Sequence, residues 1–281
     1  MTHDHYVTFK VSKTEAIVTV TFDFPPVNIQ GIQMLEDLNR LSEALESDSS
    51  AKVVVFQSAH PEIFVAHADT GFLKDISTKA VAKEDVEILF LQKVLQRISA
   101  LPQATIAKVE GFARGGGHEF MLACDMRFAA RGKAKFMQME VGMGILPCGG
   151  GASRMARQVG LGKALEIILS ARDFDADEAQ AYGTINLALD ADEIDSYVDA
   201  LAHRIAQFPA ESIEACKRVV YASIDLPIES ALKEEAYWLY QCMSKTPAQK
   251  RFQYADDNGA QNDMDNQRNW EALVIGIQEV T

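Results

Sequence analysis

Hydrophobic and polar residues alternate near the start of the chain in two short runs, Tyr6 to Val11 and Ala16 to Phe22. A period of two is typical of strands with one buried face, so we predict two paired β-strands. Consecutive prolines at positions 25 and 26 end this alternation. Apolar residues then recur at the spacing of an amphipathic helix, namely Ile32, Leu35, Leu38, Leu41 and Leu45.

The middle of the chain alternates between predicted strands and predicted helices. Residues 53–56 form a short, continuous apolar run, which is typical of a strand buried on both faces. A helical pattern follows over residues 89–98, and then a second apolar strand at 105–109. A glycine-rich turn leads into another apolar helix at 120–123. This order of strands and helices indicates a layered α/β fold.

Strand patterns become scarce after Leu189, and long helical patterns replace them at 194–208, 213–224 and 231–243. We therefore predict a core domain over residues 1–200 and a helical C-terminal region over residues 201–281. The polar segment 256–263 is interpreted as a loop. We expect the amphipathic piece after it to pack on the body or on a neighbouring subunit.

Composition and charge narrow the classes of function. The 281 residues are 48% hydrophobic and carry a formal net charge of −13, which disfavours nucleic acid as a partner. Four widely separated cysteines indicate free thiols in a reducing compartment. The first six residues lack the features of a signal peptide, and no apolar window is long enough to cross a membrane. We expect a cytoplasmic protein without membrane contact.

Three consecutive glycines, Gly115, Gly116 and Gly117, stand between a predicted strand and a predicted helix. Without side chains, they allow another molecule to approach the backbone, where N–H groups at a helix start can donate to an anionic oxygen. That arrangement is an oxyanion hole. The alternative is a turn that serves only tight contact between strand and helix.

Two glutamates lie beside glycine-rich loops. Glu119 opens an otherwise apolar helix, and Glu140 precedes the glycine-rich segment 142–151. Taken singly, each glutamate is most simply a solvated surface charge. Together they form a candidate acid/base pair, because burial in a closed site raises the pKa of a carboxyl group toward the working range.

The segment 109–119, followed by 123–125, resembles the signature of the crotonase (enoyl-CoA hydratase/isomerase) superfamily. The resemblance continues through 136–140 and 146–151, and reaches back to 64–69. It implies an α/β fold built as a spiral of ββα units, with a helical trimerisation region at the C-terminus. It also implies a homotrimer or a hexamer.

Residue by residue, the resemblance implies that Ala68 and Gly116 supply two backbone N–H donors, and that Glu119 and Glu140 are the catalytic glutamates. These two segments and the glycine-rich loop 142–151 are expected to contact substrate through Ala66, His67, Asp69, Gly115, Gly117, Pro147 and Gly149.

The implied chemistry is hydration of a 2-enoyl-CoA thioester, in which the two N–H donors stabilise an enolate. Glu119 would deprotonate the attacking water, while a protonated Glu140 would deliver a proton to Cα. The resemblance implies no metal, flavin or nicotinamide cofactor, since coenzyme A is part of the substrate. Having both glutamates favours a hydratase-like lyase; a double-bond isomerase of the same fold and a non-catalytic scaffold stay as alternatives.

Three positions depart from the family pattern. His67 stands where a glycine is usual, and Met139 where a proline often precedes the second glutamate. The turn 23–28 lacks the basic residue that many relatives use near the CoA nucleotide. His67 either lines the thioester site or only caps its own loop. A zinc-protease helix is excluded, because Leu122 occupies the place of the second histidine in HExxH.

Overall fold

Two β-sheets form the body of the protein in the computed structural model, which describes residues 5–74 and 79–277. Residues 1–4, on which part of the signal-peptide prediction rests, lie outside the described residues. The larger sheet has the order β1 (Phe9–Thr14), β2 (Ile17–Phe22), β3 (Val53–Ser58), β5 (Ala104–Val109), β7 (Met126–Ala130) and β10 (Leu187–Leu189). The smaller sheet has the order β4 (Ile63–Val65), β6 (Phe112–Arg114), β8 (Lys135–Met137) and β9 (Phe174–Asp175).

The chain crosses from the larger sheet to the smaller sheet three times, from β3 to β4, from β5 to β6 and from β7 to β8. Neighbouring strands among these six are parallel, whereas β1 and β2 form an antiparallel hairpin. The crossings wind the chain into successive layers. This arrangement confirms the predicted α/β fold class.

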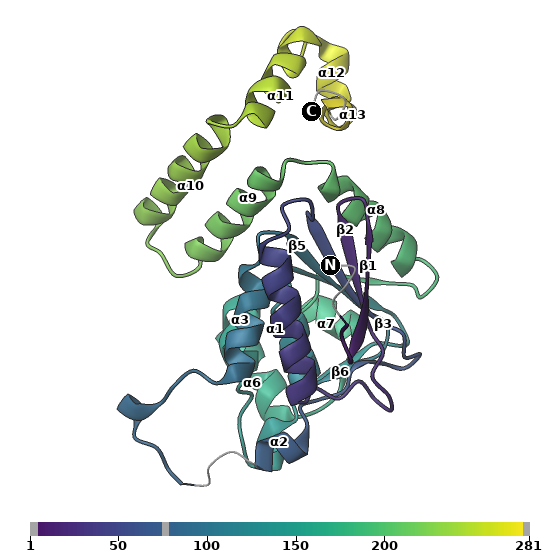
Figure 1. Cartoon of the computed structure of the whole chain (residues 1–281), viewed down its shortest axis with the longest axis vertical. Helices are drawn as coiled ribbons and strands as arrows, with labels where there is room; N and C mark the ends of the chain where they lie inside the picture. The colour runs from purple at the N-terminus through teal and green to yellow at the C-terminus, as the bar shows by residue number, and fades with distance from the viewer. Residues whose placement is uncertain (1–4, 75–78, 278–281) are drawn as a thin grey trace.

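Helices pack on the sheets (Figure 1), except η1 (Lys83–Asp85), which lies on an exposed loop away from them. Within the body the helices are α1 (Ile32–Glu46), α2 (Thr70–Lys74), α3 (Phe90–Ala100), α4 (Gly116–Leu122), η2 (Glu140–Met143), α5 (Gly151–Val159), α6 (Leu161–Ser170) and α7 (Ala176–Tyr182). Helices α1 and α3 lie side by side in Figure 1. No helix among the described residues has the apolar length needed to span a membrane.

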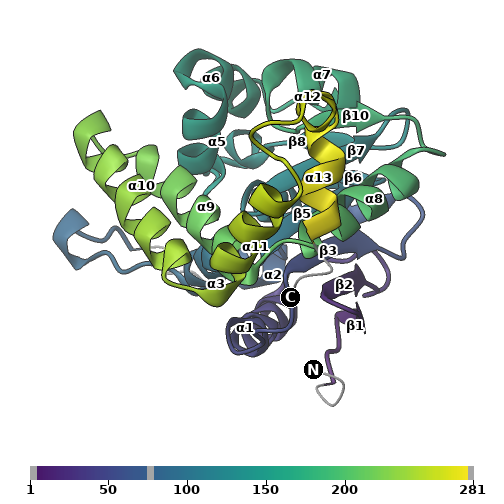
Figure 2. The ribbon, with the colours of Figure 1, turned by 90° about the horizontal axis from the view of Figure 1, so that it is seen from above.

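The C-terminal part is helical, as predicted. It comprises α8 (Ile194–Ala206), α9 (Ala210–Ser223), α10 (Ile228–Met243), α11 (Thr246–Asp257), α12 (Met264–Arg268) and α13 (Trp270–Gly276). Helix α8 packs on the larger sheet through Ile194, Val198 and Ala202. Helices α10 to α13 extend beyond the body, and Figure 2 shows them from above. The boundary predicted at residue 200 falls inside α8, and the division into two domains stays a prediction.

Some element limits differ from the sequence prediction. Strand β1 begins at Phe9 and not at Tyr6, because the N–H groups of Val7 and Thr8 donate to the Asp37 carboxylate instead of joining the hairpin ladder. The predicted loop at 256–263 starts later, since α11 continues through Asp257. The smaller sheet was not predicted, because strands of two or three residues are too short to show a period.

Aromatic side chains occupy the centre of the core, where the two sheets and α4 meet. The Phe120 ring lies 5.3 Å from the Phe22 ring and 5.1 Å from the Phe56 ring, both in edge-to-face geometry. The Phe64 ring from β4 lies 6.1 Å from Phe120. Such pairs add specific geometry to the burial of large apolar surfaces. They hold α4, and with it the neighbouring Glu119, in a defined position.

Asp37 connects α1 to the segment before β1. Its fully buried carboxylate accepts hydrogen bonds from the Val7 N–H at 2.8 Å and from the Thr8 N–H and hydroxyl at 2.9 Å. Burial by itself raises the pKa of Asp37, but the hydrogen bonds from Thr8 and Arg40 outweigh it and hold the pKa below its ordinary value. The ionised carboxylate therefore stabilises the fold.

We expect Asp37→Asn to lower the free energy of unfolding by about 1–3 kcal/mol, because the buried donors lose their charged acceptor. The wild-type contribution should be complete above about pH 4 and should decline as the pH falls further, since the folded-state pKa is the lower one. Urea unfolding across this pH range measures both effects. Asp23→Asn is the control, because its ion pair with Lys10 is solvent-exposed and should matter by less than about 0.5 kcal/mol. Equal losses in the two variants would contradict this account.

Candidate active site

The first candidate donor is the N–H of Gly116, the first residue of α4. The N–H groups of a first helical turn have no acceptor within the helix. Gly115 precedes it with φ +47° and ψ −120°, a conformation that favours glycine, and donates its own N–H to the Met137 carbonyl at 2.8 Å. In this turn the Gly116 N–H takes part neither in the helical hydrogen bonds of α4 nor in the hydrogen bond to β8, which Gly115 makes.

The second candidate donor is the N–H of Ala68. A parallel β-bridge joins Ala68 to Gln30 through the residues on either side of Ala68. The Gln30 N–H donates to the His67 carbonyl, and the Asp69 N–H donates to the Gln30 carbonyl, both at 2.9 Å. Because amides alternate along an extended strand, the Ala68 N–H faces away from this bridge. A Cβ atom placed on Gly116 would lie 3.0 Å from the Ala68 nitrogen, so the two predicted donor residues lie together.

Glu119 lies in the first turn of α4 and is only 2% exposed. Its Oε1 atom accepts the N–H of Gly149 at 2.7 Å and the N–H of Gly151 at 2.8 Å. Burial raises the pKa of Glu119 to about 7; the Glu140 charge adds to this rise, while the two hydrogen bonds and Arg154 oppose it. A carboxyl group with this pKa exchanges protons readily near neutral pH.

The loop that binds Glu119 is itself held from both sides. Arg154 donates from Nη1 to the Gly149 carbonyl at 3.0 Å, and Gln92 donates from Nε2 to the Cys148 carbonyl at 2.8 Å. A Cβ atom on Gly149 would lie 2.5 Å from Glu119 Oε2, so only glycine allows this approach. Sequence reasoning missed Arg154 and Gln92, because both belong to amphipathic helices in which polar residues are ordinary.

Glu140 is the first residue of η2 and is partly buried. Its Oε2 atom is buried without a hydrogen-bond partner among the described residues. Burial raises the pKa of Glu140, while backbone N–H groups of residues 139 and 140 and the charge of His67 oppose the rise. A Cβ atom on Gly115 would lie 2.7 Å from Glu140 Oε1. The second glutamate therefore lies against the same glycine turn that presents the Gly116 N–H.

The imidazole of His67 is partly buried, and its Nδ1 atom lies 2.9 Å from the Ala68 carbonyl oxygen. Because a carbonyl only accepts, Nδ1 carries the proton in this contact. His67 Cβ lies 3.6 Å from the place of a Gly115 Cβ. The ring thus caps its own loop and also borders the glycine turn, so both interpretations of His67 fit the structure.

Several predicted substrate contacts have structural partners within the protein. The Asp69 carboxylate accepts the Gly71 N–H at 2.7 Å at the start of α2. Gly117 packs against β4, where a Cβ atom would lie 1.9 Å from the Val65 carbonyl oxygen. Tight contact between strand and helix therefore explains Gly117, whereas Gly115 and Gly116 border the candidate site.

Ala66 and Pro147 are also placed by their neighbours. The Ala66 carbonyl accepts the Arg114 N–H at 3.0 Å, which ties the Ala68 segment to the strand before the glycine turn. Pro147 is buried beside Gly151, with its Cβ 2.8 Å from the place of a Gly151 Cβ. Contacts of these residues with substrate stay predictions.

His118 lies behind the site. Its fully buried ring has Nδ1 3.0 Å from Gln138 Nε2, and burial together with the Arg127 charge lowers its pKa to about 3. It is therefore neutral at physiological pH. Within residues 5–74 and 79–277, no group of three or more His, Cys, Asp or Glu side chains is arranged to hold a metal ion.

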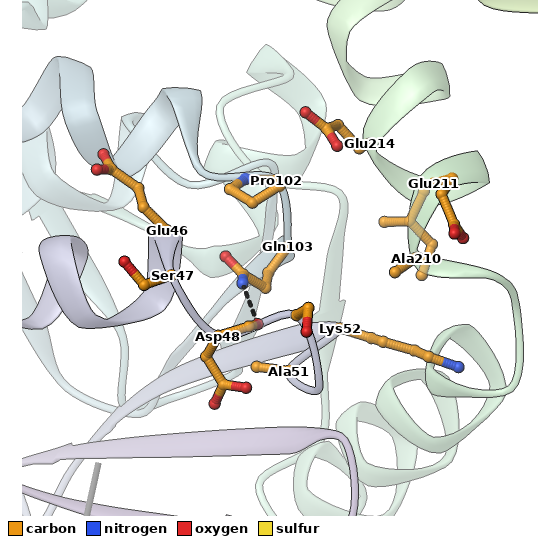
Figure 3. Close-up of a pocket in the computed structure, with 12 residues that line it drawn as sticks. Glu46, Ser47, Asp48, Ala51, Lys52, Pro102, Gln103, Ala210, Glu211 and Glu214 are labelled. Atoms are coloured by element: carbon orange, nitrogen blue, oxygen red, sulfur yellow. Dashed lines mark hydrogen bonds between the residues drawn. The ribbon is translucent and has the colours of Figure 1, made fainter. Parts of the chain in front are cut away.

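A separate hollow lies between the end of α1, the start of β3 and α9 (Figure 3). It contains none of the predicted site residues. Its lining includes the acidic residues Glu46, Asp48, Glu211 and Glu214, together with Lys52 and Gln103.

Comparison with known proteins identifies the family. The family model described as enoyl-CoA hydratase/isomerase matches residues 12–260. The chain is 31% identical to a short-chain-enoyl-CoA hydratase of Clostridium acetobutylicum, over 83% of this chain and 88% of that protein. It is 32% identical to a crotonyl-CoA hydratase of Syntrophomonas wolfei, over 82% of this chain and 88% of that protein.

Solved structures show the same likeness. A crystal structure of a putative enoyl-CoA hydratase from Streptomyces avermitilis is 38% identical, with a TM-score of 0.70 over 98% of this chain and 100% of that one. An enoyl-CoA hydratase structure from Geobacillus kaustophilus is 25% identical, with a TM-score of 0.82 over 89% and 94% of the two chains. The resemblance in the sequence is confirmed, and the chain belongs to the enoyl-CoA hydratase/isomerase family of enzymes.

Proposed function

We propose that this protein adds water across the Cα=Cβ bond of a 2-enoyl-CoA thioester. The observation that carries the proposal is the meeting of two carboxyl groups of raised pKa with two neighbouring backbone N–H donors. The hydratase names of the relatives support the same reaction type. The glutamates would act as proton-transfer groups, and the N–H donors would act on the thioester oxygen.

Attack of water at Cβ moves negative charge onto the thioester carbonyl oxygen. In this proposal the oxygen lies between the N–H groups of Ala68 and Gly116, which donate more strongly to the enolate than to the neutral thioester. Both donors belong to rigidly held backbone, so little reorganisation is needed when the charge develops.

Glu119 suits the role of general base. The N–H groups of Gly149 and Gly151 both donate to Oε1 of Glu119, which leaves Oε2 as the atom that accepts a proton from water. Glu140, whose Oε2 is buried without a partner among the described residues, suits the role of the acid that protonates Cα. Elimination of water exchanges the two roles.

The proposal needs no metal, flavin or nicotinamide, because the enolate is stabilised by backbone donors and the protons move between carboxyl groups, water and substrate. Coenzyme A enters as part of the substrate. We also propose that the enzyme acts in the cytoplasm.

We further propose a homotrimer, or a hexamer made of two trimers, assembled through the C-terminal helices. Support comes from large apolar side chains that α9 and α10 leave exposed, among them Val220, Tyr221, Leu232, Tyr237, Leu239 and Tyr240. An apolar surface of this extent favours burial against another chain.

We expect Glu119→Gln and Glu140→Gln each to lower kcat for crotonyl-CoA hydration by about 10²- to 10⁴-fold, because each removes one proton-transfer group. Loss of the conjugated thioester absorbance, with product mass, measures the reaction. Glu110→Gln is the matched control, since this partly exposed carboxylate pairs with Lys108 and Lys133 and not with a residue of the candidate site. A product with a moved double bond and no added water would contradict hydration and would indicate an isomerase.

The dependence of kcat/KM on pH should be bell-shaped. The reactive form has Glu119 ionised and Glu140 protonated. Toward low pH, Glu119 gains a proton and can no longer act as base, so the rate falls. As the pH rises, Glu140 loses the proton that it must deliver, and the rate falls again. Since the two groups interact, the apparent pKa values belong to the pair. A profile that is flat between about pH 5 and 8 would contradict the assignment of the base.

Gly149→Ala should lower kcat by about 10²-fold with a smaller change in KM, because its methyl group would displace the Glu119 carboxylate. Steady-state kinetics on the folded variant tests this. Gly162→Ala is the control, since a Cβ there would meet no atom of the described residues within 4 Å. Unchanged kcat in Gly149→Ala would show that the position of Glu119 is not critical.

A further inference from the structure

Gln30 is a buried polar residue that sequence reasoning did not select. It lies just before α1 and is 2% exposed. It follows Asn28 and Ile29, between the two prolines and the predicted helix. In the structure it touches both segments that carry the candidate N–H donors.

The backbone of Gln30 holds the first donor segment. Its N–H donates to the His67 carbonyl and its carbonyl accepts the Asp69 N–H, both at 2.9 Å. These two hydrogen bonds flank Ala68 on either side. They fix the plane of the strand from which the Ala68 N–H projects.

The side chain of Gln30 holds the second donor segment. Its Nε2 atom donates to the Gly116 carbonyl at 3.1 Å, across a separation of 86 residues in the sequence. Its Oε1 atom occupies the space beside Gly116 where a Cβ would lie, only 2.2 Å from that position. One residue therefore spans the distance between the two donors.

Folding stability does not account for an amide at this position. The Gln30 Oε1 atom is buried and has no hydrogen-bond partner among the described residues. An unpaired buried acceptor costs free energy that the single bond of Nε2 to Gly116 does not offset. An apolar side chain of the same length would avoid this cost.

We propose that Gln30 is a positioning residue that sets the spacing and the relative orientation of the Ala68 and Gly116 N–H groups. Its backbone holds one donor segment, and its carboxamide holds the other. The carboxamide acts through the two backbone segments and is not itself a donor to substrate. In its kinetic consequence this inference rests on the proposed function, because the two donors would act on the thioester oxygen.

The test compares Gln30→Met with the wild type. Methionine keeps the length of the side chain and removes both polar atoms. We expect kcat for crotonyl-CoA hydration to fall by about 10- to 100-fold, because donors displaced by a fraction of an ångström serve the transition state poorly. KM should change by less than about 3-fold, since the lost interaction acts mainly in the transition state. The midpoint of thermal unfolding should not decrease.

Gln103→Met is the matched control. Gln103 is also 2% exposed, and its Oε1 atom also has no partner within residues 5–74 and 79–277. Its Nε2 donates to the carbonyls of Leu45 and Asp48. Figure 3 shows it in the hollow beside α9, where it contacts no donor segment of the site. Its substitution should lower the midpoint of unfolding, because two hydrogen bonds are lost, and should leave kcat unchanged.

Hydrogen–deuterium exchange supplies a readout that does not depend on turnover. In Gln30→Met, amide exchange should increase in peptides covering residues 64–69 and 115–118, whereas in Gln103→Met these peptides should match the wild type. Wild-type kcat together with wild-type exchange in Gln30→Met would overturn the proposal. If the wild type fails to hydrate any 2-enoyl-CoA, the proposed function fails, and the exchange of these two segments still decides the role of Gln30.

Discussion

Burial of the Glu119 carboxylate against backbone N–H groups is the constraint on which the rest of the site depends. A carboxylate that is 2% exposed loses most of its hydration, and the donors of Gly149 and Gly151 replace only part of it. The result is a group balanced between its two protonation states near neutrality. The same burial requires glycine at position 149 and fixed support from Arg154 and Gln92.

The elements that pack around Glu119 hold its carboxyl group in one position, which keeps its pKa near neutrality. Phe120, the residue after Glu119, is locked among aromatic rings from both sheets, so α4 has little freedom to shift. The Glu140 charge disfavours ionisation of Glu119, because two like charges in a site of low polarity repel each other. Stability given up by burying charged groups at the site is regained in the apolar core around it.

Buried polar groups have different purposes in different parts of the fold. Asp37 is fully hydrogen-bonded and connects α1 to the segment before β1, which is a contribution to stability. Gln30 and Glu140 each keep, near the glycine turn, an oxygen that has no hydrogen-bond partner in the described part of the chain. Unsatisfied groups of this kind are disfavoured in a core that serves only stability. Gln103 carries such an oxygen in the hollow beside α9, so the relevant observation is that Gln30 and Glu140 lie beside the donors of Ala68 and Gly116, which agrees with a site organised for a ligand.

The sequence by itself determined the α/β class, the long helices, the first hairpin and the two glutamates beside glycine turns, because periodicity and glycine runs are local signals. It also carried the family resemblance. Only the tertiary structure decided which N–H groups hold Glu119, that Gln30 joins the two donor segments, and that Gly117 serves contact with β4. These contacts join residues up to 86 positions apart, and no pattern within a single segment specifies them. The short strands of the smaller sheet were missed for the same reason, since their stability comes from neighbours in space and not from their own sequence.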